Sequence, residues 1–185
     1  MQRRIRGRPR WRLSAGMLGV LGAALLAVTA NGVRAAPGLP ALAPAAKFET
    51  GAGTRSLAEF RGRKVMLWMY STWCSSCAAG LDALEAHQRS LKRAGVEVIA
   101  LQNFQNGGYP GPSPRKFVER FASALLAAPN WIFGTVPEAM AKRYNPRRYP
   151  DIYFLIDEQG MVRAIEGAPG ATMDQILRFV EDKRG

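Results

Sequence analysis

The hydrophobic pattern of the chain is most informative at residues 64–101, where two apolar runs enclose a segment of helical periodicity. Residues 64–70 form a nearly continuous apolar run of strand length, which predicts a strand buried on both faces of a sheet. Residues 74–94 carry leucines at helical spacing, and Gly95 is placed to end that helix. Residues 96–101 predict a second strand, so this region is expected to form a β-α-β unit.

Further elements are predicted on the C-terminal side of this unit. Residues 105–114 are rich in Gly, Pro and Asn and predict a loop, after which Pro114 is suited to begin a helix that extends to Leu126. Thr172 is a candidate N-cap for a final helix. The remaining elements are strands at 131–133, 151–156 and 161–165, a turn at 157–160 and a short helix at 137–144.

The segment before the first predicted strand divides into two parts by composition. Residues 36–46 hold three prolines among small residues and predict an extended linker. In residues 48–60, Gly51 and Gly53 are expected to interrupt any regular element. The order β-α-β-α-β-β-α predicts one α/β domain at residues 47–185, with a central mixed β-sheet and helices on both faces.

The first 35 residues have the three parts of an export signal. Six arginines lie within residues 3–12, an apolar stretch of small residues spans 15–30, and Ala35 ends an A-x-A-like cleavage site. The alternative is an uncleaved membrane anchor through residues 15–30, although a spanning helix needs about 20 predominantly apolar residues. Both interpretations place the domain outside the cytoplasm, in a periplasmic or equivalent compartment.

Much of the formal net charge of +12 lies in the first 35 residues. Seven of the 26 lysines and arginines lie before residue 36, where there is no acid. Residues 36–185 therefore hold 19 basic and 14 acidic residues, a net charge of +5. That part of the chain contains no basic run long enough to follow a phosphate backbone, so nucleic-acid binding is not expected.

Two cysteines, Cys74 and Cys77, lie at the predicted junction of strand and helix. A structural disulfide that closes so short a loop removes little entropy from the unfolded chain, so a redox role fits the spacing better. At the first turn of a helix, unpaired N–H groups and the helix dipole favour a thiolate, which makes Cys74 the predicted attacking cysteine. Cys77 is placed to resolve the mixed disulfide that results.

Metal binding is the competing interpretation of a C-x-x-C pair. A structural zinc site needs four ligands, and beyond the pair the chain offers no further cysteine and only His87, so no metal is expected. His87 is instead expected to be an ordinary helix-face residue, while a Cu(I)-binding chaperone, which needs only two thiolates, stays an alternative. No cofactor is expected beyond a redox-active Cys74–Cys77 disulfide, because the chain has no glycine-rich strand-to-helix turn and no C-x-x-C-H motif.

The chain resembles the thioredoxin superfamily in three features. These are the apolar strand that leads to Trp73-Cys74-Ser75-Ser76-Cys77, the Tyr149-Pro150 pair before a second strand, and the hairpin at Gly160. Within it, the chain is most similar to the exported TlpA/ResA-like reductases, over about residues 45–183. This resemblance implies a thioredoxin fold and exchange of disulfides with cysteine-containing protein substrates. It also implies the reducing direction, as in cytochrome c maturation, with electrons from a membrane or extracytoplasmic thiol donor.

The resemblance also assigns roles around the cysteines. It implies that Cys74 attacks and that Cys77 resolves. Pro150 is expected to be a cis-proline that faces them, and the main chain of Tyr149 is expected to offer hydrogen bonds to an extended substrate segment. The supporting residues that the resemblance implies are Trp73, Ser75, Ser76, Tyr149 and Pro150.

Three departures from the family pattern are visible. Trp68 stands six positions before the first cysteine, where the family usually has an acid or asparagine, so the usual proton-handling group is expected to be missing. Gly80 and Asp82 replace an acid and a proline after the second cysteine, and the strand after Pro150 is one residue longer. The alternative function is therefore a non-catalytic binding or assembly module that retains an idle disulfide.

Two further features are open to a functional interpretation. The loop at residues 105–114 is longer than a minimal fold needs, and it is expected to be a tolerated surface insertion, with partner selection as the alternative. Trp131 and Phe133 are expected in the core rather than on a binding platform.

Overall fold

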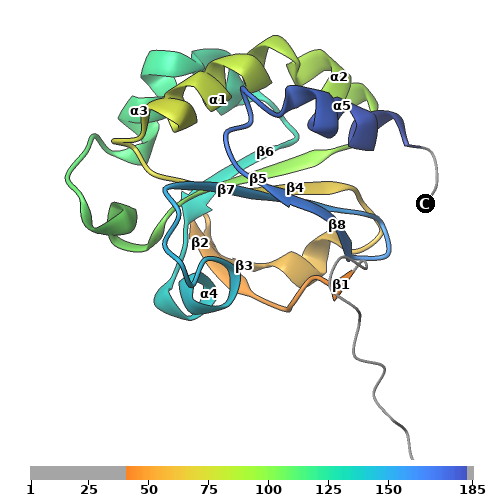
Figure 1. Ribbon diagram of the computed structural model, residues 1–185, viewed down its shortest axis with the longest axis horizontal. Helices are drawn as coiled ribbons and strands as arrows, with labels where there is room; N and C mark the ends of the chain where they lie inside the picture. Colours follow the sequence, from red (N-terminus) through yellow and green to blue (C-terminus); the bar gives the residue numbers. More distant parts are fainter. Residues whose placement is uncertain (1–40, 183–185) are drawn as a thin grey trace, which may run out of the picture. The chain divides into compact units, whose positions relative to one another are not determined.

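A computed structural model describes residues 41–182 of the chain (Figure 1). The strands are β1 (Ala41–Leu42), β2 (Lys47–Thr50), β3 (Gly53–Ser56), β4 (Val65–Tyr70), β5 (Glu97–Gln102), β6 (Trp131–Thr135), β7 (Asp151–Ile156) and β8 (Met161–Glu166). The α-helices are α1 (Ser75–Ala86), α2 (Gln88–Arg93), α3 (Pro114–Phe121), α4 (Glu138–Tyr144) and α5 (Met173–Glu181), with short 3-10 helices η1 (Leu57–Phe60), η2 (Phe104–Gly108) and η3 (Ser123–Ala127).

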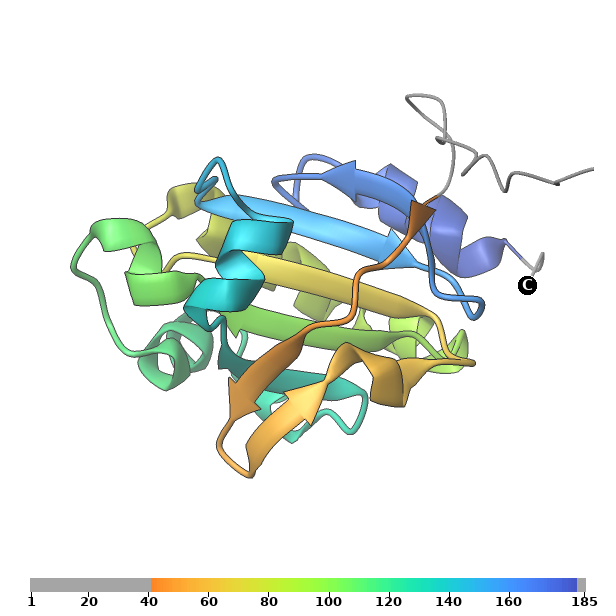
Figure 2. The same ribbon diagram turned by 90° about the horizontal axis from the view of Figure 1, so that it is seen from below.

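These strands form a single mixed sheet in the order β1-β8-β7-β4-β5-β6-β2-β3. The central strand β4 is parallel to β5 and antiparallel to β7. Helices α1, α2, α3 and α5 lie over one face of the sheet, and α4 lies over the other (Figures 1 and 2). The predicted mixed sheet with helices on both faces is therefore confirmed, as are the five strands and the short helix predicted between residues 64 and 166.

Strand β4 is buried along its whole length, as its apolar run predicts. Successive side chains of a strand point to opposite faces of the sheet, so the run supplies two cores at once. Met66, Trp68 and Tyr70 pack in the core beneath α1, α3 and α5. Val65, Leu67 and Met69 pack in the core on the α4 side. The end of β4 is thereby held rigidly from both faces.

The linker prediction is wrong from residue 41 onward, while residues 36–40 lie outside the described part of the chain. Ala41 and Leu42 pair with β8, the N–H of Ala43 donates to the carbonyl of Gly160 at 2.8 Å, and the carbonyl of Pro44 accepts the Tyr144 hydroxyl at 2.5 Å. Without β1, the side of β8 that faces away from β7 would be a free strand edge, and an extended, small-residue segment can take up its hydrogen bonds. Residues 41–46 therefore belong to the domain.

Gly51 lies in the turn that ends β2, as expected of a break, but Gly53 begins β3, so the segment forms a hairpin. Gly53 has a φ of +113°, a conformation that side chains other than glycine rarely adopt. The same hairpin approaches β6 closely, because a Cβ at Gly134 would lie 2.1 Å from the carbonyl oxygen of Glu49.

Two predicted helices are interrupted by hydrogen bonds from neighbouring groups. The helix expected at residues 74–94 divides at His87, whose ring Nδ1 contacts the carbonyl of Ala83 at 2.9 Å. Helix α3 ends at Phe121 rather than extending to Leu126, and the chain continues as η3. There the N–H of Ala124 donates to the Glu85 carboxylate of α1 at 2.8 Å, so tertiary contact overrides the local helical pattern.

Thr172 occupies the N-cap position of α5, but its side chain makes no capping bond. Its hydroxyl instead donates toward the carbonyls of Gly167 and Ala168 and contacts the hydroxyl of Tyr153 at 2.7 Å. Thr172 is therefore the N-cap residue as predicted, but its side chain does not cap the helix.

The predicted export leader at residues 1–35 lies outside the described residues and stays a prediction. Among residues 41–182, no helix has the length and apolar character needed to cross a membrane.

Candidate active site

Both cysteines lie where β4 gives way to α1, as the sequence predicts. The N–H of Cys74 donates to the carbonyl of Ser71 at 3.2 Å, which closes a tight turn after the strand. Cys74 is the N-cap residue of α1 and Cys77 lies in its first turn. Only 6% of Cys74 is exposed and Cys77 is fully buried, and both are free thiols.

Cys77 is held as a neutral thiol by its surroundings. Its Sγ donates to the carbonyl oxygen of Pro150 at 3.3 Å, across from the start of β7. Burial, followed by the negative charge of Asp151, raises the pKa of Cys77 well above its usual range. Attack by Cys77 therefore requires a group that takes up its proton.

Asp151 is the group near the cysteines that the sequence did not reveal. The sequence predicts it only as the first residue of a strand, yet one of its carboxylate oxygens and the two Sγ atoms lie within 4.8 Å of one another. The carboxylate accepts a hydrogen bond from Trp68 Nε1 at 2.8 Å and another from Ser76 Oγ at 2.8 Å. Trp68 stands where the family usually has an acid or asparagine, as expected, and β7 brings a carboxylate beside the cysteines from another part of the sheet.

Cys74, Cys77 and Asp151 are also the kinds of donor that bind metals. Among residues 41–182 the cluster contains these three groups and no fourth. A structural zinc site needs four ligands. The expected absence of a metal stays a prediction, and His87, ten residues or roughly 15 Å of helix beyond Cys77, does not belong to the cluster.

Two buried asparagines fix the Tyr149–Pro150 segment. Asn103 Nδ2 donates to the carbonyls of Tyr149 at 3.2 Å and Pro150 at 3.1 Å. Asn145 donates to the Tyr149 carbonyl at 2.7 Å and accepts the Tyr149 N–H at 2.8 Å. The main-chain groups of Tyr149 are thus engaged within the domain, and the expectation that they offer hydrogen bonds to a substrate stays a prediction. The cis geometry of Pro150 stays a prediction.

The loop at residues 105–114 is fastened to the cysteine turn rather than free on the surface. Asn106 accepts the N–H of Thr72 at 2.8 Å through its side chain and the indole N–H of Trp73 at 2.7 Å through its carbonyl. The rings of Trp73 and Tyr109 lie 4.8 Å apart. This loop therefore orients Trp73, a role that the interpretation as a tolerated surface insertion did not include.

Exposed aromatic side chains flank the buried thiols. Trp73 is 41% exposed, Tyr109 61% and Tyr149 45%, although large aromatic side chains usually bury most of their surface. Ser75, between the cysteines, is also exposed, and Ser76 is half-buried. Trp131, in contrast, is buried in the core, and the half-buried Phe133 stacks on it at 5.5 Å and packs against the same core, as expected.

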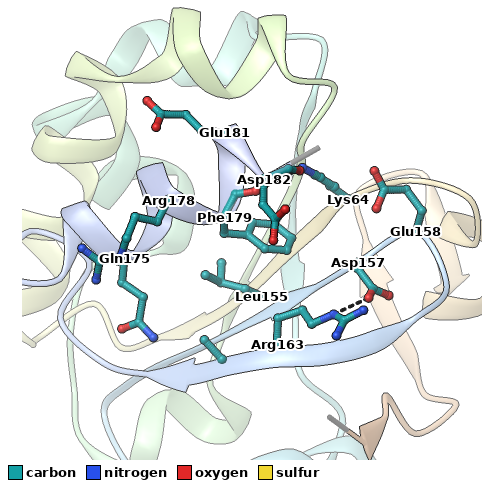
Figure 3. A pocket seen from close by; sticks show the side chains of 11 residues that line it. Lys64, Leu155, Asp157, Glu158, Arg163, Gln175, Arg178, Phe179, Glu181 and Asp182 are labelled. Atoms are coloured by element: carbon teal, nitrogen blue, oxygen red, sulfur yellow. Dashed lines mark hydrogen bonds and ion pairs between the residues drawn. The ribbon is translucent and has the colours of Figure 1, made fainter. Parts of the chain in front are cut away.

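A hollow of about 760 Å³ lies at the other end of the central strands (Figure 3). It contains the ion pair of Asp157 with Arg163 and the Lys64 ammonium, which donates to the carbonyls of Phe179 and Val180 at the end of α5. A cation at a helix C-terminus interacts favourably with the helix dipole and stabilises the helix. The burial of this lysine is therefore explained by its role in the fold. No cysteine or histidine lines the hollow.

A mixed sheet with a C-x-x-C pair at the start of a helix defines a thioredoxin-like protein, and the comparisons agree with that class. A family model described as the AhpC/TSA family matches residues 39–165, and the chain belongs to this family. The chain is 33% identical over 109 residues to the thiol-disulfide oxidoreductase ResA of Geobacillus kaustophilus. It is 30% identical over the same length to ResA of Geobacillus thermodenitrificans. Each alignment covers 59% of this chain and 57% of the relative, so the chain spans little more than half of the curated relatives it matches.

Solved structures confirm the predicted fold. A thiol:disulfide interchange protein DsbE from Chlorobium tepidum, itself described as putative in function, superimposes with a TM-score of 0.59 and 21% identity, covering 76% of this chain and 96% of that one. A thioredoxin-like protein from Aeropyrum pernix has a TM-score of 0.56 and 23% identity, covering 72% and 88%. At these identities the likeness shows the thioredoxin fold alone.

Proposed function

We propose that this chain is a thiol–disulfide oxidoreductase that exchanges disulfides with cysteine-containing proteins through Cys74 and Cys77. The observation that carries the proposal is the pair of free thiols at the first turn of α1, with their sulfur atoms within 4.8 Å of one another. A small movement brings them to bonding distance, so the pair can alternate between dithiol and disulfide. The chain then needs no cofactor other than this disulfide.

The order of the two steps follows from burial and position. Cys74 is the more accessible sulfur and stands at the helix start, so its thiolate attacks a substrate disulfide and forms a mixed disulfide. Cys77 then attacks the Cys74 sulfur, which releases the substrate as a dithiol and leaves a Cys74–Cys77 disulfide. Two electrons pass from the cysteine pair to the substrate.

The exposed aromatic side chains indicate how a protein substrate is held. Trp73, Tyr109 and Tyr149 stand around the pair and offer apolar surface to an extended segment that carries the target cysteine. Because Asn103 and Asn145 occupy the main-chain groups of Tyr149, side-chain contact carries more of this recognition than backbone pairing.

Charge around the thiols supports net reduction of the substrate. A disulfide pair is strongly oxidising when its reduced form is stabilised, for example by a thiolate of very low pKa. Here burial and the neighbouring Asp151 carboxylate raise the pKa of Cys77, so this sulfur gains no such stabilisation. Reduction, including that of cysteines wrongly oxidised or awaiting haem attachment, requires a thiol donor for the return of electrons. An exported location, by cleavage or by anchoring through residues 15–30, places that donor in or beyond the membrane.

The binding-module alternative loses its main support because Asp151 supplies the carboxylate that Trp68 does not. The proposed function is tested by measuring whether the full chain reduces a disulfide-linked two-chain protein, with dithiothreitol as the electron source.

Reduction releases the two chains, which precipitate. We expect this precipitation to begin well before it begins in a control with dithiothreitol alone. A folded chain that leaves the rate at the control value would contradict the proposal.

A further inference from the structure

We propose that Asp151 is the proton acceptor of the cysteine pair and that the Ser76 hydroxyl carries the proton between Cys74 and Asp151. This inference rests on the proposed function, because it assigns the path by which the attacking thiol becomes a thiolate. It starts from two contacts of one hydroxyl group: Ser76 Oγ lies 3.0 Å from Cys74 Sγ and 2.8 Å from Asp151 Oδ2.

The direction of these two hydrogen bonds follows from the number of hydrogens available. An ionised carboxylate only accepts, so the single hydroxyl hydrogen of Ser76 is the one that points to Asp151. Ser76 can therefore meet Cys74 only through an oxygen lone pair, and the thiol of Cys74 is the donor in that contact. The result is one continuous chain, from the Cys74 thiol through the Ser76 hydroxyl to the Asp151 carboxylate.

Transfer along this chain moves one proton from Cys74 to Asp151 and leaves the net charge of the site unchanged. The Cys74 proton passes to Ser76 Oγ while the Ser76 proton passes to Asp151 Oδ2. Cys74 becomes a thiolate, Asp151 becomes a neutral acid, and the restored Ser76 hydroxyl now donates to the sulfur. Because one negative charge is shared, the site never holds the two neighbouring anions whose repulsion would oppose ionisation of the thiol.

The same carboxylate closes the cycle of the proposed reaction. As the Cys74 thiolate bonds to one substrate sulfur, the substrate S–S bond breaks and Asp151 returns its proton to the departing sulfur. The carboxylate then accepts the Cys77 proton while Cys77 bonds to Cys74, and the second substrate sulfur leaves and receives this proton from Asp151. Two electrons and two protons have passed from the cysteine pair to the substrate disulfide.

Trp68 is the positioning residue for this carboxylate. Its fully buried indole carries one N–H donor and no acceptor, and it engages Asp151 Oδ1 at 2.8 Å. That bond directs Oδ2 toward Ser76. Strands β4 and β7 are neighbours in the sheet, so a residue of β4 can hold a carboxylate that begins β7.

Two buried tyrosines lie near the cysteines and Asp151. Tyr70 from β4 faces Cys77, and Tyr153 of β7 faces Asp151 together with Glu166 of β8. Burial, the largest cause in both cases, raises the pKa of each tyrosine, so both stay neutral. The tyrosines therefore take no part in the relay.

Three single variants test the relay: Asp151→Asn, which keeps the shape and an acceptor for Trp68; Ser76→Ala, which removes the bridge; and Asp82→Asn, which removes an exposed charge elsewhere on α1. The exchange rate and the ionisation of the thiols, followed by absorbance of the thiolate, are both measured against pH. We expect Asp151→Asn and Ser76→Ala to lower the exchange rate at neutral pH by about 10- to 100-fold, the lower part of the range for general base catalysis. Asp82→Asn is expected to match the wild type.

The two readouts of Asp151→Asn are expected to move in opposite directions. Loss of the neighbouring negative charge lets Cys77 ionise at lower pH, while loss of the acceptor slows exchange. A carboxylate that only repelled thiolates would instead give faster exchange in D151N. An active wild type with D151N and S76A at or above its rate would overturn the relay and leave the proposed function standing. An inactive wild type would overturn the proposed function itself, and if D151N failed to fold, S76A would decide.

Discussion

The Cys77→Ser variant is expected to accumulate a stable mixed disulfide with its protein substrate, while Cys74→Ser is expected to reduce exchange to the uncatalysed rate. The reason is positional: Cys74 is the sulfur at the accessible start of α1, and Cys77 is buried behind it with its thiol directed at Pro150. Without Cys74 no bond to substrate forms. Without Cys77 the bond forms and nothing behind it releases the substrate.

Mass spectrometry after rapid quenching with an alkylating reagent detects the trapped species directly. Asp82→Asn is the control, because Asp82 lies on the same helix but is exposed and away from the cysteines. It is expected to turn over like the wild type and to accumulate no adduct. Adducts on Cys77 in C74S, or full turnover by either single cysteine variant, would contradict the assigned order.

Truncation of Trp68 is expected to cause the largest loss of stability of any single change near the site. Trp68 is fully buried in the core beneath α1, with its ring 5.1 Å from that of Tyr70. Gly80 leaves room for the indole, because a Cβ at that position would lie 3.2 Å from the Trp68 ring and 3.2 Å from Pro169. Trp68→Ala should lower the free energy of unfolding by about 3–5 kcal/mol, the usual cost of emptying such a site.

Urea denaturation followed by circular dichroism measures this loss. Trp68→Phe keeps an aromatic ring in the core but removes the N–H donor to Asp151 together with part of the indole. The lost hydrogen bond alone is expected to cost about 1–3 kcal/mol, the range for a buried acceptor that loses its partner, so Trp68→Phe should fall between the wild type and Trp68→Ala. A Trp68→Ala variant within about 1 kcal/mol of the wild type would show that this side chain is not the anchor of β4.

Burial patterns explain which parts of the fold could be predicted from sequence. The run that forms β4 is apolar on both faces because both faces meet a core, and it predicts a central strand without further information. The placement of the cysteines follows from that strand, since a motif directly after a central strand lies at the end of the strands, where the chain leaves the sheet.

Long-range hydrogen bonds explain what could not be predicted. Asp151 is 74 residues beyond Cys77 in sequence, and only the antiparallel pairing of β4 with β7 brings it to Trp68 and Ser76. Its one local signal is polarity: it is the sole charged residue in an otherwise apolar or aromatic strand and directly follows Pro150. The break in α3 and the pairing of β1 depend likewise on partners far along the chain.

The redox equilibrium of the Cys74–Cys77 pair is the most direct test of the account. The full chain is equilibrated in dithiothreitol or glutathione buffers of graded potential, quenched with an alkylating reagent and analysed by mass. The account predicts a single two-electron transition that forms an intramolecular Cys74–Cys77 disulfide. The ratio of oxidised to reduced chain should change tenfold for each step of about 30 mV in potential. The midpoint is expected near thioredoxin's value of about −270 mV or below. A midpoint near about −120 mV would contradict the reducing direction, and a pair that forms no intramolecular disulfide at any potential would contradict the central claim.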